Sequence, residues 1–299
     1  IKFNKRGNGY EIVNNFDFTN LNEFNFTYKF ELDGESILEN TINIDIEPTK
    51  KETVKIAVPK NLDTSKELIL TISAITKQAK GLLEKGHEVA WEQFILNTPK
   101  QLVTKSVNGS LEILDSKEII EVKNDKVKAV FNKTSGILTG LSFNNGANII
   151  KDKNGFTPNF WRAPIDNDFG NNLHKRSKVW RYASKNRKLV GIKAVMQGTN
   201  ALVHVNYDLL NKENIKIAEF KISYTVKNDG SILMKNNFEK KQKNLPDLPR
   251  IGLNIQLLRE YDNVSWYGRG PFESYLDRKS GAKIGTYSGL VDDFNWAYI

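Results

Sequence analysis

The chain has 299 residues, of which 39% are hydrophobic and 26% charged, a composition typical of a soluble globular protein with a substantial core. It contains no cysteine, which excludes disulfides and thiolate metal sites. Its three histidines, His87, His174 and His204, are too far apart in the sequence to suggest a metal cluster. No apolar run approaches the ~20 residues that a transmembrane helix needs, so we expect no membrane partner.

The net charge of +9 raises the possibility of nucleic-acid binding. The lysines, however, fall on predicted strand faces and turns and do not line one helix, and no nucleic-acid-binding signature is present. Lysine on β edges also has a structural use, since it discourages edge-to-edge pairing. The sequence therefore predicts no nucleic-acid partner.

Residues 1–98 alternate short β-branched runs with turn residues. Strands are predicted over residues 11–15, 24–32, 37–46, 53–58, 68–75 and 89–96. Asp33 and Gly34 form a strong hairpin signal between two of these strands. This spacing predicts an immunoglobulin-like β-sandwich over residues 1–98.

Residues 99–109 are predicted to form a linker, and a second pattern of longer strands follows over residues 110–299. Asn228, Asp229 and Gly230 predict a hairpin turn, and residues 172–184 are the best helix candidate, because Leu173, Arg176, Val179 and Trp180 share a helical face. The pattern predicts a large antiparallel sandwich, with strands over 119–122, 128–131, 189–196, 201–209, 215–226, 231–238, 251–257 and 264–267.

Residues 159–170 combine two aromatics, an arginine, a proline and two aspartates, a mixture that predicts a rigid polar loop at the edge of a β core. Pro164 fixes φ, and Gly170 permits a sharp exit. Asp166 and Asp168 have two interpretations. They either brace the loop by accepting backbone N–H bonds, or form a carboxylate pair, since residues i and i+2 of a β segment point to one face. The spacing does not fit a calcium loop.

Four strings resemble those of the large multidomain β-galactosidases of glycoside hydrolase family 2. Residues 162–170 read R-A-P-I-D-N-D-F-G and are similar to the family signature R-A-P-x-D-N-D-x-G. Residues 266–278 read W-Y-G-R-G-P-F-E-S-Y-L-D-R and match W-x-G-x-G-P-x-E-x-Y-x-D-R. Residues 249–254 and 86–94 supply two further matches in the family's order.

The resemblance implies that the chain is an excerpt: a fourth domain followed by a C-terminal domain, incomplete at its end, with a fold like galactose mutarotase. The catalytic (β/α)8 barrel would lie upstream and would hold both carboxylates of a retaining glycosidase, so no catalytic residue is nominated here. The resemblance also implies no cofactor or metal in this fragment, and Mg²⁺ and Na⁺ in the barrel. The partners would be that barrel and a galactoside substrate. A homo-oligomer, and a bacterial cytoplasmic or periplasmic location, are left open.

In the family, the residues after the first signature form a mobile loop that reaches the sugar site. The resemblance therefore implies a pocket-lining, substrate-binding loop at Asp166, Asn167, Asp168, Gly170, Asn171 and Asn172. The sequence departs from the family pattern after Gly170, which weakens the assignment of Asn171 and Asn172.

The remaining signature residues are interpreted as structural: Arg162, Pro164, Trp266, Gly268, Gly270, Pro271, Glu273, Tyr275, Asp277 and Arg278. Arg162 is expected to have a buried partner, and Arg278 to pair with Asp277 or Glu273. The alternative is that Trp266, Tyr267, Phe272 and Tyr275 stack on a sugar. Trp161 and Trp180 are expected to anchor the core or a domain interface.

Two functions of different classes follow. The first is the accessory C-terminal region of a β-galactosidase, inactive alone, which supports the barrel and lines its sugar pocket. The second is a free-standing carbohydrate-binding β-sandwich module. A mutarotase-like epimerase, which needs a histidine and a carboxylate facing one sugar, is disfavoured by the dispersed histidines.

Overall fold

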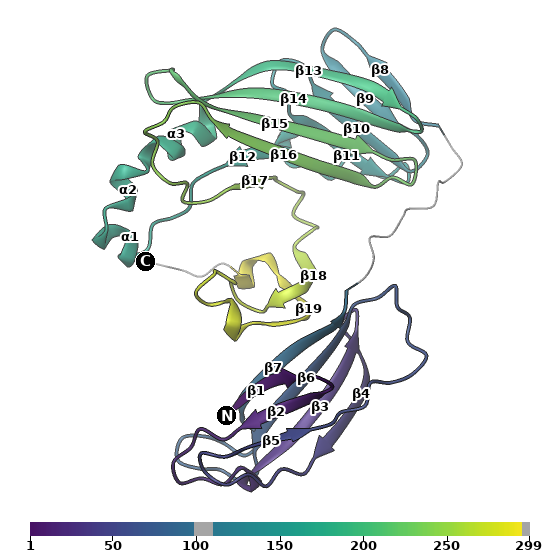
Figure 1. The fold of residues 1–299 in the computed structure, drawn as a ribbon. Helices are drawn as coiled ribbons and strands as arrows, with labels where there is room; N and C mark the ends of the chain where they lie inside the picture. Colours follow the sequence, from purple (N-terminus) through teal and green to yellow (C-terminus); the bar gives the residue numbers. More distant parts are fainter. Residues whose placement is uncertain (99–109, 295–299) are drawn as a thin grey trace. The chain divides into compact units, whose positions relative to one another are not determined.

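A computed structural model describes residues 1–98 and 110–294 and confirms the predicted all-β class (Figure 1). These residues fall into two compact units, one combining residues 1–98 with residues 262–294 and the other spanning residues 110–261. The predicted linker, residues 99–109, lies outside the described residues.

The N-terminal part of the first unit is a sandwich of two antiparallel sheets, β1-β2-β5 and β4-β3-β6-β7. Phe26, Phe30, Leu70 and Ile72 are fully buried in its core, and β6 is buried on both faces. The strands are β1 (Lys2–Arg6), β2 (Gly9–Val13), β3 (Phe24–Leu32), β4 (Glu35–Ile42), β5 (Lys51–Val54), β6 (Leu68–Thr76) and β7 (Glu88–Asn97), with a 3-10 turn η1 (Leu21–Glu23).

The predicted hairpin at Asp33 and Gly34 is confirmed. Strands β3 and β4 pair antiparallel, with Leu32 opposite Glu35. Both turn residues have positive φ, 49° and 83°, which is the backbone that a two-residue hairpin with the sheet's natural twist requires.

The C-terminal part of the first unit is a second hairpin. It pairs β18 (Asn263–Gly270) with β19 (Lys283–Leu290) and includes the 3-10 turns η3 (Lys279–Gly281) and η4 (Val291–Phe294). Strand β19 contacts β7: the Gln93 side chain exchanges two hydrogen bonds with the Ile284 backbone, and Lys283 pairs with Glu88 at 2.7 Å. Contacts thus group residues 262–294 with the N-terminal sandwich.

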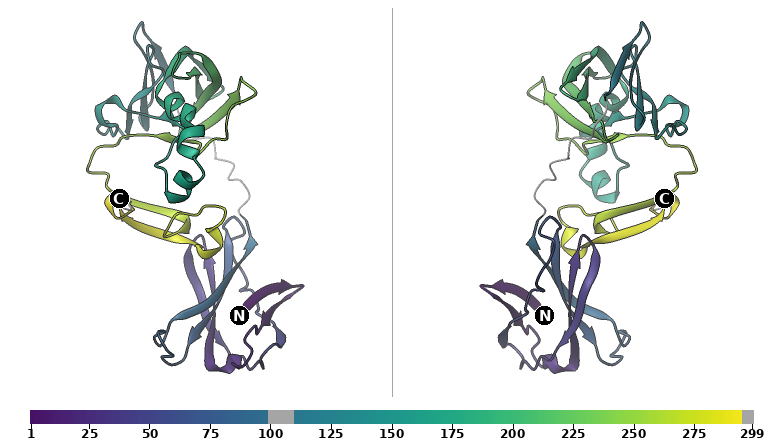
Figure 2. Two further views of the ribbon diagram at one scale, coloured as in Figure 1. Left: turned by 90° about the vertical axis from the view of Figure 1, so that its left-hand side faces the viewer. Right: turned by 90° about the vertical axis from the view of Figure 1, so that its right-hand side faces the viewer.

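The second unit is a sandwich of two four-stranded antiparallel sheets, β11-β10-β9-β8 and β13-β14-β15-β16. Figures 1 and 2 show the sheets as facing layers, with the helices at one end. Buried and less buried residues alternate along β14 and β15, because one face of the sheet meets the core. The strands are β8 (Glu112–Asp115), β9 (Ile119–Lys123), β10 (Val127–Asn132), β11 (Leu138–Phe143), β13 (Arg187–Gln197), β14 (Asn200–Leu210), β15 (Lys216–Val226) and β16 (Ile232–Lys240).

A small sheet and three short helices complete this unit. Strand β12 (Thr157–Asn159) pairs with β17 (Gly252–Asn254), and a 3-10 turn η2 (Lys151–Lys153) lies before it. The helices are α1 (Asp166–Gly170), α2 (Leu173–Arg176) and α3 (Lys178–Lys185). None of the helices in the described part of the chain is long and apolar enough to span a membrane.

The sequence predicted a single helix over residues 172–184, but the structure has two helices there, α2 and α3. The break falls at Ser177, which is buried and whose hydroxyl donates to the Asp247 backbone oxygen at 3.3 Å. Trp180 is fully buried, as predicted, and its indole N–H donates to the Pro246 oxygen at 3.0 Å. A tertiary hydrogen bond thus fixes the chain where the apolar periodicity alone indicated a continuous helix.

Candidate functional site

Aromatic packing fixes the start of the 159–170 segment. The Phe160 ring is fully buried and packs edge-on against Trp180 and Phe220, with centroids 6.3 and 5.6 Å away. Its backbone N–H donates to the Ser184 hydroxyl of α3 at 2.8 Å. Burying a side chain of this size contributes roughly 1.5–3 kcal/mol. The segment therefore leaves the core from a rigid point.

An ion pair closes the segment on itself. Both Asp168 carboxylate oxygens accept from the Arg162 guanidinium, at 2.5 and 2.9 Å, and one also accepts the Ile165 N–H at 3.0 Å. The Asp168 side chain is 6% exposed and that of Arg162 is 22% exposed. Ile165 is the N-cap of α1 and has no side-chain acceptor, so Asp168 supplies half of a capping box from position N3. The partner predicted for Arg162 is confirmed.

The Asp168 carboxyl is stabilised in its charged form. Burial raises its pKa, but the hydrogen bonds from Arg162 and from the Ile165 N–H outweigh this effect and hold the pKa below its usual range. A carboxylate whose pKa is lowered and whose oxygens already accept three hydrogen bonds is poorly suited to act as a general acid near neutral pH. The bracing interpretation is therefore correct for Asp168.

The other residues of the predicted sugar loop do not share the buried position of Asp168. Asp166, Asn167 and Gly170 are exposed on α1. The segment is helical, so the predicted β-type alignment of Asp166 with Asp168 is wrong. Gly170 is also not the sharp exit, because the left-handed backbone falls at Asn172 (φ 60°). These residues share one exposed stretch of chain.

The amides after Gly170 differ in how far the chain itself engages them. The Asn171 side-chain oxygen accepts from the Leu173 N–H at 3.0 Å and from Arg176 at 2.9 Å. Asn172 is exposed and caps α2 through its backbone carbonyl, which accepts from Arg176 N–H at 3.0 Å. The side-chain oxygen of Asn171 is thus already hydrogen-bonded within the local turn.

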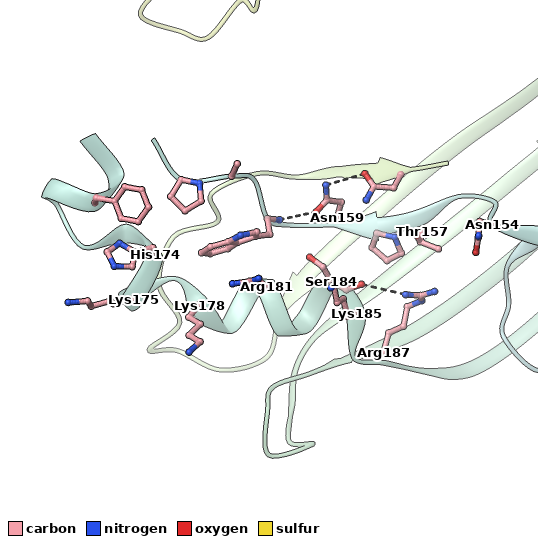
Figure 3. A pocket seen from close by; sticks show the side chains of 16 residues that line it. Asn154, Thr157, Asn159, His174, Lys175, Lys178, Arg181, Ser184, Lys185 and Arg187 are labelled. Atoms are coloured by element: carbon pink, nitrogen blue, oxygen red, sulfur yellow. Dashed lines mark hydrogen bonds between the residues drawn. The ribbon is translucent and has the colours of Figure 1, made fainter. Parts of the chain in front are cut away.

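A groove of about 1130 Å³ runs beside this segment, between β12 and helices α2 and α3 (Figure 3). Trp161, Pro158 and Pro164 give it apolar walls, and no carboxylate lines it. Six basic side chains line it instead: His174, Lys175, Lys178, Arg181, Lys185 and Arg187. The prediction that the lysines do not line one helix is wrong for this cluster, which the sequence-based reasoning missed. Their helical spacing over residues 178–185 was the signal that could have revealed it.

His174 lies at one end of the groove. Its ring packs against Phe169, with centroids 4.8 Å apart, and its buried Nδ1 has no hydrogen-bond partner within residues 1–98 and 110–294. Residues 1–98 and 110–294 contain no group of three or more histidine, aspartate or glutamate side chains arranged to hold a metal ion. The groove is therefore suited to binding an anion, through its cationic side chains and one imidazole. Its lining residues form no nucleophile–base pair of the kind that catalysis needs.

The second signature segment lies in the other unit, on β18 and the loop after it. Arg278 pairs with Glu273, as predicted. Both side chains are largely exposed, Arg278 by 61% and Glu273 by 50%. Tyr267, Phe272 and Tyr275 are also exposed, so the interpretation that the aromatics of this segment pack in a core is wrong for these three. Phe272 and Tyr275 line a cavity of about 1090 Å³ together with Trp266. Asp277 forms no ion pair with the residues that the structure describes.

Close packing explains one glycine of this segment, Gly270. A Cβ on Gly270 would lie 2.7 Å from the Tyr287 ring and 3.0 Å from that of Trp266. These two rings stack with centroids 5.4 Å apart. Gly270 therefore lets the strand end pass directly over an aromatic pair.

Comparison with known proteins agrees with the resemblance read from the sequence. The profile described as beta-galactosidase, domain 4, matches residues 10–97, and the profile described as beta galactosidase small chain matches residues 123–299. The β-galactosidase of Priestia megaterium is 29% identical over 95% of this chain, and that of Clostridium acetobutylicum is 29% identical over 96%. The chain spans 27% and 31% of the length of these two relatives.

The two profiles fall in chain order on successive β-rich regions, which defines the class: an accessory β-sandwich region of the β-galactosidase type. Because one profile matches more than half of the residues, the chain belongs to the beta galactosidase small chain family.

Proposed function

We propose that this chain acts as the C-terminal accessory region of a longer β-galactosidase. The supporting observation is that both profile matches occur in order in a chain that aligns over nearly its whole length with a limited part of β-galactosidases. The longer enzyme would hydrolyse terminal β-D-galactosides by a retaining mechanism, with both catalytic carboxylates, and any Mg²⁺ or Na⁺, in a barrel outside this chain.

The domain division proposed with this function is a fourth domain over residues 1–98, a linker over 99–109 and a C-terminal domain over 110–299. Its role would be to support the barrel and to place residues 166–172 at the sugar pocket. The rigid anchor at Phe160 and the Arg162–Asp168 pair favour this role, because they hold the base of an otherwise exposed loop.

The test is an assay with a nitrophenyl β-D-galactoside. The chain alone should give no turnover above buffer, and the longer protein should be active. In the longer protein, Asp166→Ala or Asn172→Ala should raise KM, while Asp125→Ala, an exposed control on a distant turn, should not. Turnover by the chain alone, or equal KM values for all three variants, would contradict the proposal.

The exposed aromatics favour a second candidate, a carbohydrate-binding module. Phe272 and Tyr275 are 60% and 57% exposed beside Trp266 and could stack on the apolar face of a sugar. A lactose titration followed by calorimetry distinguishes the two. The accessory role predicts no binding tighter than millimolar, whereas a module would bind more tightly and lose that binding in Phe272→Ala.

A further inference from the structure

The basic groove beside α3 has no part in the proposed activity, and its charges work against the local structure. Lys178, Arg181 and Lys185 lie three and four residues apart, so they share one face of the helix as like charges. Lys178 and Arg181 also occupy the first turn, where the helix dipole disfavours cations. α3 has no acidic residue in this turn to offset them.

These cations also have no carboxylate partner among the described residues. None of Lys175, Lys178, Arg181 and Lys185 takes part in an ion pair, although seventeen such contacts occur elsewhere in residues 1–98 and 110–294. All four side chains are exposed. A cluster of this kind is relieved by an anionic occupant.

We propose that this groove binds an acidic polypeptide segment in an extended conformation. The eight residues of α3 span about 12 Å, and Arg181 and Lys185 are about 6 Å apart along its axis. Alternate side chains of an extended segment repeat every ~6.6 Å on one face. The Arg181–Lys185 separation is therefore close to one such repeat, and the row from Lys178 to Lys185, about 10 Å long, offers cations to two or three carboxylates of the segment.

The apolar and polar walls also suit a peptide. Trp161, Pro158 and Pro164 can cover aliphatic stems. Thr157, on β12, lies at the end of the groove nearest Lys185 and Arg187 (Figure 3). A single phosphate would reach only part of a cluster about 10 Å long. Single-stranded nucleic acid needs a series of open aromatic faces, and the Phe169 ring already packs on His174. The site goes beyond the proposed function and does not depend on it.

Calorimetric titration of this chain with an oligoglutamate peptide of about eight residues tests the proposal. Binding should be measurable at low salt and weaken as salt screens the charges. The triple variant Lys178→Glu, Arg181→Glu, Lys185→Glu should bind at least tenfold more weakly. The neutral variant Lys178→Gln, Arg181→Gln should weaken binding in the same direction and disturb the fold less.

The matched control reverses three exposed lysines of the same unit, Lys117, Lys193 and Lys235, which do not line this groove and form no ion pair with the described residues. This control has the same net charge as the groove variant and should keep binding within about twofold. The proposal is overturned if the peptide does not bind, or if groove and control variants weaken binding equally. It is also overturned if inorganic phosphate or single-stranded DNA of equal charge binds as tightly as the peptide.

Discussion

The two signature segments carry the same kind of ion pair in opposite surroundings. In the first, the Arg162–Asp168 pair is largely buried and closes a helix cap, and the carboxylate accepts two hydrogen bonds from Arg162 and one from the Ile165 N–H. In the second, the Arg278–Glu273 pair lies on an exposed loop. Burial decides what such a pair contributes, because breaking a buried pair leaves an uncompensated charge, while an exposed pair exchanges its partner for water.

The comparison also separates structure from recognition. Around the first pair Phe160 and Trp180 are buried and hold the segment, and Phe169 of α1 is exposed beside the polar residues. Around the second pair the aromatic residues themselves are exposed. Both segments combine arginine, acidic and aromatic residues. In the first segment these residues stabilise the fold, and in the second they form an exposed surface.

The largest effect is expected for Arg162→Ala. Removal of the guanidinium leaves the Asp168 carboxylate buried without its main partner, and we expect the free energy of unfolding to fall by about 3 kcal/mol. Calorimetric melting should show the loss, and hydrogen exchange should place it in residues 157–185. An unchanged melting temperature would mean that the pair does not brace the segment.

A smaller effect with a distinctive pH dependence is expected for Asp168→Asn. The native pKa of Asp168 is lowered, so the charged carboxylate stabilises the fold fully above its ordinary pKa, and this contribution is lost as pH falls through the lowered value. The variant should be less stable by about 2 kcal/mol at neutral pH. The difference from the unmodified chain should shrink below about pH 4. Urea unfolding across this range provides the measurement, and a constant difference would contradict the assignment.

Arg278→Ala should change little. Both partners are exposed, and such pairs contribute about 0–1 kcal/mol. Melting and hydrogen exchange measured beside Arg162→Ala give the direct contrast. A loss equal to that of Arg162→Ala would remove the distinction between the two segments.

The smallest effect is expected for Gly170→Ala. The glycine φ is not in the left-handed region, and a Cβ would meet nothing within 4 Å, so the fold should be unchanged or stabilised by less than about 1 kcal/mol. Any change in KM of the longer enzyme would then report on the sugar loop rather than on folding. Measurable destabilisation would show that Gly170 has a backbone role that its conformation does not indicate.

The sequence by itself determined the β class, most strands and the main turns, because these depend on local chemistry. Alternating apolar residues and β-branched runs predict strands, and the turns at Asp33–Gly34 and Asn228–Gly230 follow from residues that adopt positive φ. The partner of Arg162 was predictable in kind, since a guanidinium beside a core needs a carboxylate.

Only the tertiary structure decided which carboxylate that is, where the helix breaks, and which segment faces the basic side of α3. Asp168 was chosen over Asp166 because the segment winds into a helix cap instead of a strand. The break at Ser177 depends on a hydrogen bond to a residue seventy positions away. The basic groove exists because β12 and α3 are brought together by the core, and no local pattern encodes which distant segments meet across it.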